Sequence, residues 1–263
     1  MGVNNCKEQP LPETSNTIKV LRRLGPIPML VKVFLVGTAV VASLALLGFA
    51  LNAEWALVKV GEENNIPTWF SSVQLFVIAA VLSPIVIRDS DRRRPSTWAL
   101  AVVPGLFILL SLDEVAMFHE RLGQWLEVSA GVGAGLRTGP WVLIFVPLVG
   151  LLSVAAAVVF WPYLRGRRDV VALAIVGFGV FGLSAVGLEL IANLPAGGSI
   201  AQKLLGFAEE IGEMLGGSII LWSAVLVMQL EGVRVDLGTP RLRQSLPKPE
   251  ADVERSLNAP ART

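Results

Sequence analysis

The chain contains six apolar runs of about 20 residues, and this feature limits the fold more than any other. They lie at about 33–51, 67–87, 97–120, 140–163, 170–192 and 204–230. As a helix, a run of this length crosses the roughly 30 Å of hydrocarbon in a bilayer. Only 16% of the residues are charged, against about 25% in soluble domains. The sequence therefore predicts an all-α polytopic membrane protein, a bundle of six transmembrane helices.

Two polar segments flank the apolar runs, at 1–32 and 231–263. We interpret the first as a cytoplasmic N-terminal tail and the second, which is rich in proline and charge, as a disordered cytoplasmic C-terminal tail. With both termini inside, 18 of the 22 Lys and Arg residues fall in inner segments. The positive-inside rule favours this orientation, so we expect a plasma (inner) membrane protein with both termini cytoplasmic.

The composition excludes several classes of function and partner. A net charge of +1 gives no basic field for nucleic acid, so membrane lipids are the expected partners. The single cysteine, Cys6, excludes an intramolecular disulfide framework and a Cys-rich zinc site. Small residues spaced for close helix contact occur at 177–182 and 212–216. They predict tight helix packing, and they would also suit a homo-oligomer.

Ionisable residues are concentrated in two of the apolar runs. Residues 111–121 hold Asp113, Glu114, Glu120 and the only histidine of the chain, His119. The last run holds Glu209, Glu210 and Glu213, while Glu54 and Glu189 end two other runs. Such residues are costly within a membrane and usually mark function. The topology places all of them in the outer half, which predicts an outward-facing acidic pocket with residues 113–120 and 209–213 as its two walls.

Helix geometry refines this pocket. Asp113 and Glu120 are seven residues apart and share one face of a straight helix. A last helix that begins at Leu204 would place Glu209 and Glu210 in its first turns, where the helix dipole favours acids. Glu213 would then lie near the midplane of the membrane. At the second run, Asn65 or Thr68 is the expected helix cap.

Several uncompensated carboxylates cannot all stay ionised in a medium of low dielectric constant. They must share protons, pair with cations or bind a metal ion. One histidine with several carboxylates suits a divalent ion of Fe, Mn, Mg, Ca or Zn. The candidate metal ligands are Asp113, Glu120, Glu209, Glu213 and His119, and the candidate catalytic groups are His119 and Glu114. Supporting or proton-sharing roles are expected for Glu210, Glu189, Glu54, Ser71 and Ser72.

Three functions fit this pattern. The leading hypothesis is a metal-binding, carboxylate-rich site open to the extracytoplasmic side, in a membrane enzyme that acts on lipid or another apolar substrate. It rests on the site being one-sided, since transporters usually bind near the midplane between repeats. The alternatives are a cation- or proton-coupled transporter and a non-catalytic membrane sensor or assembly protein. For Ser71 and Ser72, ordinary helix packing is the competing interpretation.

Three motifs give the chain a likeness to known proteins. They are Asn65-Ile-Pro-Thr-Trp-Phe-Ser-Ser72, Leu112-Asp-Glu followed by His-Glu120, and Glu209-Glu-x-x-Glu-Met214. Over most of residues 33–230 the chain resembles a group of bacterial six-span inner-membrane proteins with no assigned activity. The resemblance implies an inner-membrane location. Ser71 or Ser72 with Asp113 also matches in kind the Ser and Asp of ceramidase-like metallohydrolases, whose paired histidines are absent here.

Overall fold

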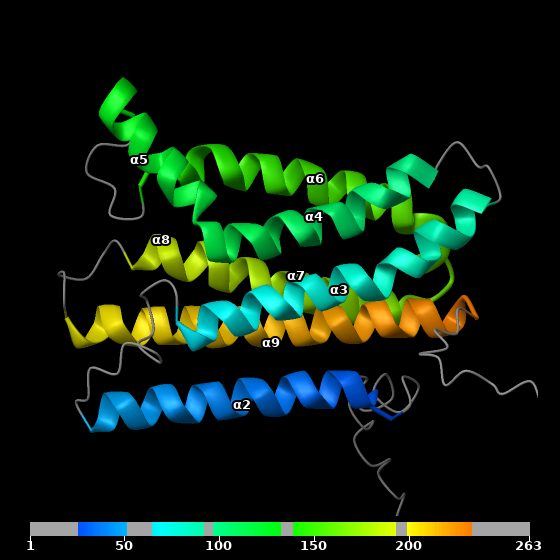
Figure 1. Ribbon diagram of the computed structural model, residues 1–263, viewed down its shortest axis with the longest axis horizontal. Helices are drawn as coiled ribbons and strands as arrows, with labels where there is room; N and C mark the ends of the chain where they lie inside the picture. The colour runs from blue at the N-terminus through cyan, green and yellow to red at the C-terminus, as the bar shows by residue number, and fades with distance from the viewer. Residues whose placement is uncertain (1–25, 52–64, 92–96, 133–138, 193–198, 233–263) are drawn as a thin grey trace, which may run out of the picture. The chain divides into compact units, whose positions relative to one another are not determined.

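The computed structural model describes residues 26–51, 65–91, 97–132, 139–192 and 199–232, with the backbone alone at 89–91 and 97–99. These residues belong to one compact unit, Met1–Val233. Within them the regular structure is entirely helical, as predicted (Figure 1). Glu54 and most of both predicted tails, including the disorder expected after 231, lie outside the described ranges. The elements are α2 (Met29–Ala50), α3 (Ile66–Asp91), α4 (Thr97–Ala116), α5 (Phe118–Ala130), α6 (Trp141–Leu164), α7 (Arg168–Gly182), the π-helix η1 (Leu183–Leu188), α8 (Glu189–Ile191) and α9 (Ile200–Leu230).

Five stretches of helix are long and apolar enough to cross a membrane: α2, α3, α6, the continuous α7–η1–α8 and α9. A sixth is obtained when α4 and α5, which meet at an angle of 66°, are counted as one broken span. The all-α prediction is therefore confirmed for the described residues, which contain five to six helices long and apolar enough to span a membrane. Among the helix starts, those of α2 and α9 differ most from the prediction, because these helices begin at Met29 and Ile200. Each starts four residues before the predicted position.

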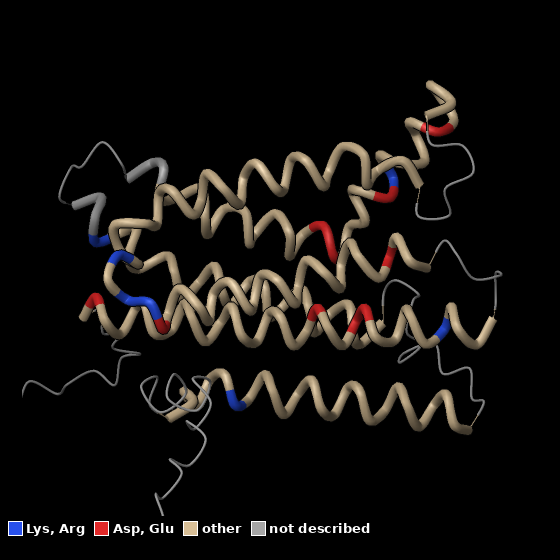
Figure 2. The backbone as a smooth tube through the Cα atoms, turned by 180° about the vertical axis from the view of Figure 1, so that it is seen from behind, with Lys and Arg blue, Asp and Glu red and all other residues tan. Residues whose placement is uncertain are grey.

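Consecutive long helices run in opposite directions, so the described part of the chain has two distinct ends (Figure 1). At one end α3, α6 and α9 finish and α7 begins. We call this the basic end because most of the described Lys and Arg residues gather there (Figure 2). We call the opposite end, where α4 finishes and α6 and α9 begin, the acidic end. The half of the bundle next to it holds most of the described Asp and Glu residues (Figure 2).

Helix α9 is the most buried of the candidate spans and packs against α2, α3 and α7. Its last four turns carry the buried residues Ile220, Leu221 and Ala224. These residues belong to one apolar cluster with Ile78 and Ile85 of α3 and with residues of α4 and α7. The core of the described unit therefore lies mainly toward the basic end.

Two glycines let α7 and α9 approach closely. A Cβ atom on Gly216 would lie 2.7 Å from the Cα atom of Phe181, and one on Gly177 would lie 2.8 Å from the backbone nitrogen of Ile220. A side chain at either position would collide with backbone. This supports the packing interpretation of both small-residue spacings, although Gly179 and Gly182 have no such neighbour within 4 Å.

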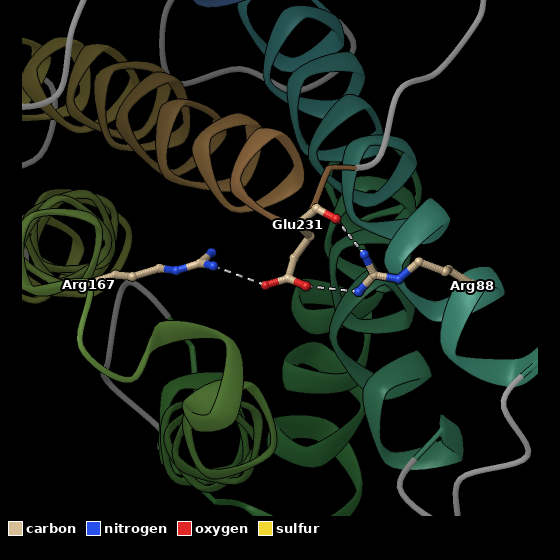
Figure 3. Close-up of polar contacts among 3 residues, drawn as sticks. All are labelled: Arg88, Arg167 and Glu231. Atoms are coloured by element: carbon tan, nitrogen blue, oxygen red, sulfur yellow. Dashed lines mark hydrogen bonds and ion pairs between the residues drawn. The ribbon is translucent and has the colours of Figure 1, made fainter.

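Polar contacts fasten the helices at two levels. Ser72 and Ser111 each donate a hydrogen bond from Oγ to the carbonyl oxygen of the other, both at 2.8 Å, which joins α3 to α4. At the basic end, Glu231 receives Arg88 at 2.9 Å and Arg167 at 3.3 Å on its two carboxylate oxygens (Figure 3). Arg88 also donates to the carbonyl oxygen of Glu231 at 2.7 Å. This group, the Glu231 clamp, ties the ends of α3 and α9 to the start of α7.

Candidate functional site

A cavity of about 380 Å³ lies in the half of the bundle next to the acidic end. Residues of both predicted walls line it, together with Glu189. Neither Lys nor Arg is among the described residues that form its wall. The ionisable lining residues are Asp113, Glu114, His119, Glu120, Glu189, Glu209, Glu210 and Glu213.

The first wall is built around a break in the helix. Met117 adopts the left-handed conformation, with φ 55° and ψ 40°, between α4 and α5. Asp113 bridges the break, because its Oδ1 accepts the backbone N–H of His119 at 3.0 Å and its Oδ2 lies 2.6 Å from His119 Nδ1. A carboxylate at the start of α5 also satisfies an orphan amide and the helix dipole. The carboxylate thus fixes both the backbone and the ring of His119.

This break corrects the straight-helix prediction for residues 97–120. Because the chain turns by 66° at Met117, the seven-residue spacing does not put Asp113 and Glu120 on one helix face. Asp113 is instead paired with His119, on the other side of the break. A non-glycine residue with left-handed backbone has no signature in the apolar pattern, and so the sequence alone predicted a continuous helix.

Aromatic rings of α6 hold the His119 ring from another direction. The rings of His119 and Trp141 meet edge to face with centroids 4.6 Å apart, and Phe145 lies next in the same group at 6.1 Å. The side chains of His119 and Asp113 are 22% and 19% exposed. Both side chains therefore line the cavity and are mostly shielded from solvent. Asp113 and the aromatic contacts together restrain the ring at its Nδ1 side and on its face.

The second wall belongs to α9, whose start differs from the prediction. Ser199 caps the helix and accepts the N–H of Gln202 at 3.2 Å. The pattern Ser-x-x-Gln at 199–202 is a capping-box signature that places the helix start earlier than the apolar run does. With Ile200 as the first helical residue, Glu209 and Glu210 lie in the third turn. The helix dipole, which acts within the first turn, does not explain them.

Glu213 is the deepest acid of the cavity. It lies 13 residues after Ile200, about 20 Å along the helix at 1.5 Å per residue. Its carboxyl group is enclosed by protein atoms, so the surface that stays accessible faces the cavity. Among the described residues it makes no hydrogen bond or ion pair. Its electrostatic neighbours are all acids: Glu114, Glu189, Glu209 and Glu210.

Glu189 joins the second wall through an irregular turn. The π-helix η1 (Leu183–Leu188) lies between α7 and α8, and Ala185 and Val186 of this turn line the cavity. Glu189 is an electrostatic neighbour of Glu209, and both carboxyl groups line the cavity. π-Turns within longer helices are frequent at functional sites.

The cavity also has an apolar wall that we did not predict. It consists mainly of Trp141, Phe145 and Val149 of α6, with Phe181 of α7 and Val186 of η1. The three α6 residues are four apart and therefore share one helix face. In the sequence this face is hidden, because α6 is apolar on every side.

The remaining predicted residues have other positions. The Ser72 side chain is hydrogen-bonded to Ser111. Neither Ser71 nor Ser72 is among the described lining residues of the cavity, whereas Thr68 is. Asn65 caps α3, because its Oδ1 accepts the N–H of Thr68 at 2.9 Å, as expected. In the described part of the chain no three His, Cys, Asp or Glu groups are placed to hold a metal ion. The geometry gives no support to the metal site, which stays a prediction.

Comparisons with known proteins give a family. Neither the curated proteins nor the solved structures include a match to this chain. The model of a family described as a domain of unknown function, DUF8692, matches residues 29–229. The match covers all the described helices except the last residue of α9. The chain therefore belongs to the DUF8692 family.

Proposed function

We propose that this protein is a six-span membrane protein whose cavity binds the positively charged group of a ligand that enters from the extracytoplasmic side. The observation that carries the proposal is the acid lining of the cavity, which contains seven carboxyl groups and, in its described part, no Lys or Arg. A cation offsets the repulsion and the desolvation cost of such a set. Both termini and the basic end are cytoplasmic, in keeping with the positive-inside rule.

The Asp113–His119 pair supplies the chemistry of the site. Contact with the Asp113 carboxylate holds the proton of the neutral imidazole on Nδ1, which leaves Nε2 as the basic nitrogen. A carboxylate that orients a histidine in this way is the arrangement of a general base. His119 therefore accepts a proton from the bound ligand or from a water beside it. Glu114, on the same wall, is the second candidate for proton transfer.

A one-sided site favours an enzyme or a receptor over a carrier. Toward the basic end the bundle is filled by apolar side chains, among them Ile78, Ile85 and Leu221, and is fastened by the Glu231 clamp. Beyond Glu213, toward the basic end, a cation meets one buried polar pair, Gln74 with Ser218, and then the apolar core. Moving it further would require separation of α3, α7 and α9.

Cation–proton exchange is the second candidate, and irregular helices favour it. The break at Met117 and the π-turn at 183–188 both adjoin the cavity, and broken helices beside the site are typical of secondary transporters. Uptake of labelled tetramethylammonium into proteoliposomes, driven by a pH gradient, distinguishes the two. We expect no uptake above that of empty liposomes. Uptake that Glu213→Gln abolishes would establish the carrier instead.

Cation binding is tested with the purified protein in nanodiscs of zwitterionic lipid. Isothermal titration with tetramethylammonium and with Mn²⁺ is expected to show saturable binding of at least one of them, weakened at least tenfold by Glu213→Gln. Glu127→Gln is the matched control, because Glu127 is an exposed acid outside the cavity lining. If both variants behave alike, or if neither these two ions nor an ammonium ion with an apolar chain binds, the proposal is wrong.

Orientation is tested by cysteine labelling in a Cys6→Ser background. Glu127→Cys lies on α5 near the acidic end, and Arg165→Cys follows α6 at the basic end. A membrane-impermeant maleimide should label position 127 in intact cells and position 165 only after permeabilisation. The reverse pattern would place the cavity on the cytoplasmic side and overturn this part of the proposal.

A further inference from the structure

The two kinds of surface in the cavity lie on different helices. The acids come from α4, α5, α8 and α9, whereas α6 contributes only apolar and aromatic side chains, at 141, 145, 146 and 149. From Trp141 to Val149 this apolar wall is about 12 Å long at 1.5 Å per residue. A small inorganic ion would leave that wall unused. The lining therefore indicates a ligand with both a cationic and an apolar part.

The volume of the cavity points the same way. About 380 Å³ lies at the lower end of the range of roughly 300–1,000 Å³ that holds organic ligands. Glu213 has no described hydrogen-bond or ion-pair partner and faces the cavity, with only acids as its charged neighbours. It marks the place of the cationic group. Trp141 and Phe145 give the apolar part of such a ligand a broad aromatic surface.

The cavity also lies close to the lipid-facing surface. Val149 lines it and is nevertheless 37% exposed, and the neighbouring Leu148 is 46% exposed. On the opposite side Gly182 lines it and is exposed, while Leu183 beside it is 71% exposed. Helix α6 packs against α4 and α5 and touches α7 only slightly. Between α6 and α7, therefore, residues that line the cavity are also exposed at the surface of the described bundle.

From these observations we infer that the ligand is an amphiphilic organic cation, an amine or quaternary ammonium with an apolar chain, which enters on the extracytoplasmic side, from the outer leaflet of the bilayer between α6 and α7. Its charged group lies at Glu213 and its chain lies along the α6 wall. The inference rests on the proposed function and names the substrate class of the same site.

The test compares octyltrimethylammonium with tetramethylammonium, which has the same charge and no chain. Both are titrated into the protein in zwitterionic nanodiscs, with empty nanodiscs subtracted. We expect octyltrimethylammonium to bind at least tenfold more tightly, and Glu213→Gln to weaken it at least tenfold. Val149→Trp, which adds bulk to the apolar wall, should weaken octyltrimethylammonium at least tenfold more than it weakens tetramethylammonium. Leu151→Trp is the matched control, because Leu151 is 68% exposed on α6 and outside the described lining.

The outcomes separate the two proposals. Equal affinity for the two ammonium ions, or an octyltrimethylammonium affinity that Val149→Trp does not change, would overturn the amphiphile inference and leave cation binding in place. If neither ammonium ion nor Mn²⁺ binds, or if Glu213→Gln binds like the natural protein, the proposed function fails and the inference fails with it. Thermal unfolding of each variant shows whether it is folded before its binding is interpreted.

Discussion

The two halves of the bundle treat buried charge in opposite ways. At the basic end, Glu231 has an arginine on each carboxylate oxygen, and the space beside the clamp is filled by a continuous apolar core. Toward the acidic end, Glu213 has only acids around it and faces an open cavity. In the first arrangement both oxygens of the Glu231 carboxylate are paired with arginines. In the second, acids gather around a cavity whose described lining holds no Lys or Arg, and such a cluster of ionisable groups in a cavity marks a candidate functional site.

Both halves depend on the contact between α7 and α9, and its loss gives the largest expected effect. Gly216→Val should lower the free energy of unfolding by about 3 kcal/mol, because overpacking against a fixed backbone costs 1–3 kcal/mol or more. Thermal unfolding in detergent measures the change. Gly150→Val on α6, where no atom lies within 4 Å of the added Cβ, should be nearly neutral. Equal stability of the two variants would show that the close contact does not hold the halves together.

Loss of the Glu231 clamp should have the next largest effect on stability. Glu231→Gln keeps the shape of the side chain and removes the charge that faces Arg88 and Arg167. Because these side chains are 21–29% exposed, solvent screens the pair, and the expected loss is about 1.5 kcal/mol. Glu127→Gln, at an exposed position on α5, is the matched control. A loss no greater than that of the control would remove the contrast between the arginine-paired Glu231 and the acids of the cavity.

The same substitution in the cavity should change stability in the other direction. Glu213→Gln removes an acid that is surrounded by acids, and replacing a functional residue of this kind commonly stabilises a protein by about 1 kcal/mol. Thermal unfolding without added cation measures this gain, and cation titration measures the accompanying loss of binding. Destabilisation by Glu213→Gln would mean that this carboxylate already has a partner within the protein. The cavity would then be a structural polar core.

The contrast also explains which features the sequence could predict. Apolar runs of about 20 residues located the spans because a lipid solvent imposes that length. Ionisable residues such as Glu213 and Asp113 were recognisable too, because placing an ionisable side chain in lipid costs free energy. The pairing of Asp113 with His119 was hidden, since it depends on one left-handed residue, Met117. The apolar wall of α6 was hidden too, because an apolar face that lines a cavity has the same composition as one that faces lipid.

Substitutions at Met117 have the smallest expected effect on stability. They test whether the backbone of this residue is left-handed, and therefore whether the helix is broken between α4 and α5. A left-handed conformation costs an ordinary residue about 1 kcal/mol or more but is free for glycine, whose greater freedom when unfolded offsets about half of that gain. Met117→Gly should therefore be more stable than Met117→Ala by about 0.5 kcal/mol, since both variants lose the same side chain. At Val115, within α4, glycine should instead be less stable than alanine. Thermal unfolding of the four variants gives the two signs. If alanine is the more stable residue at both positions, α4 and α5 form one straight helix in the membrane. Asp113 and Glu120 would then share one face of that helix, as the sequence predicts.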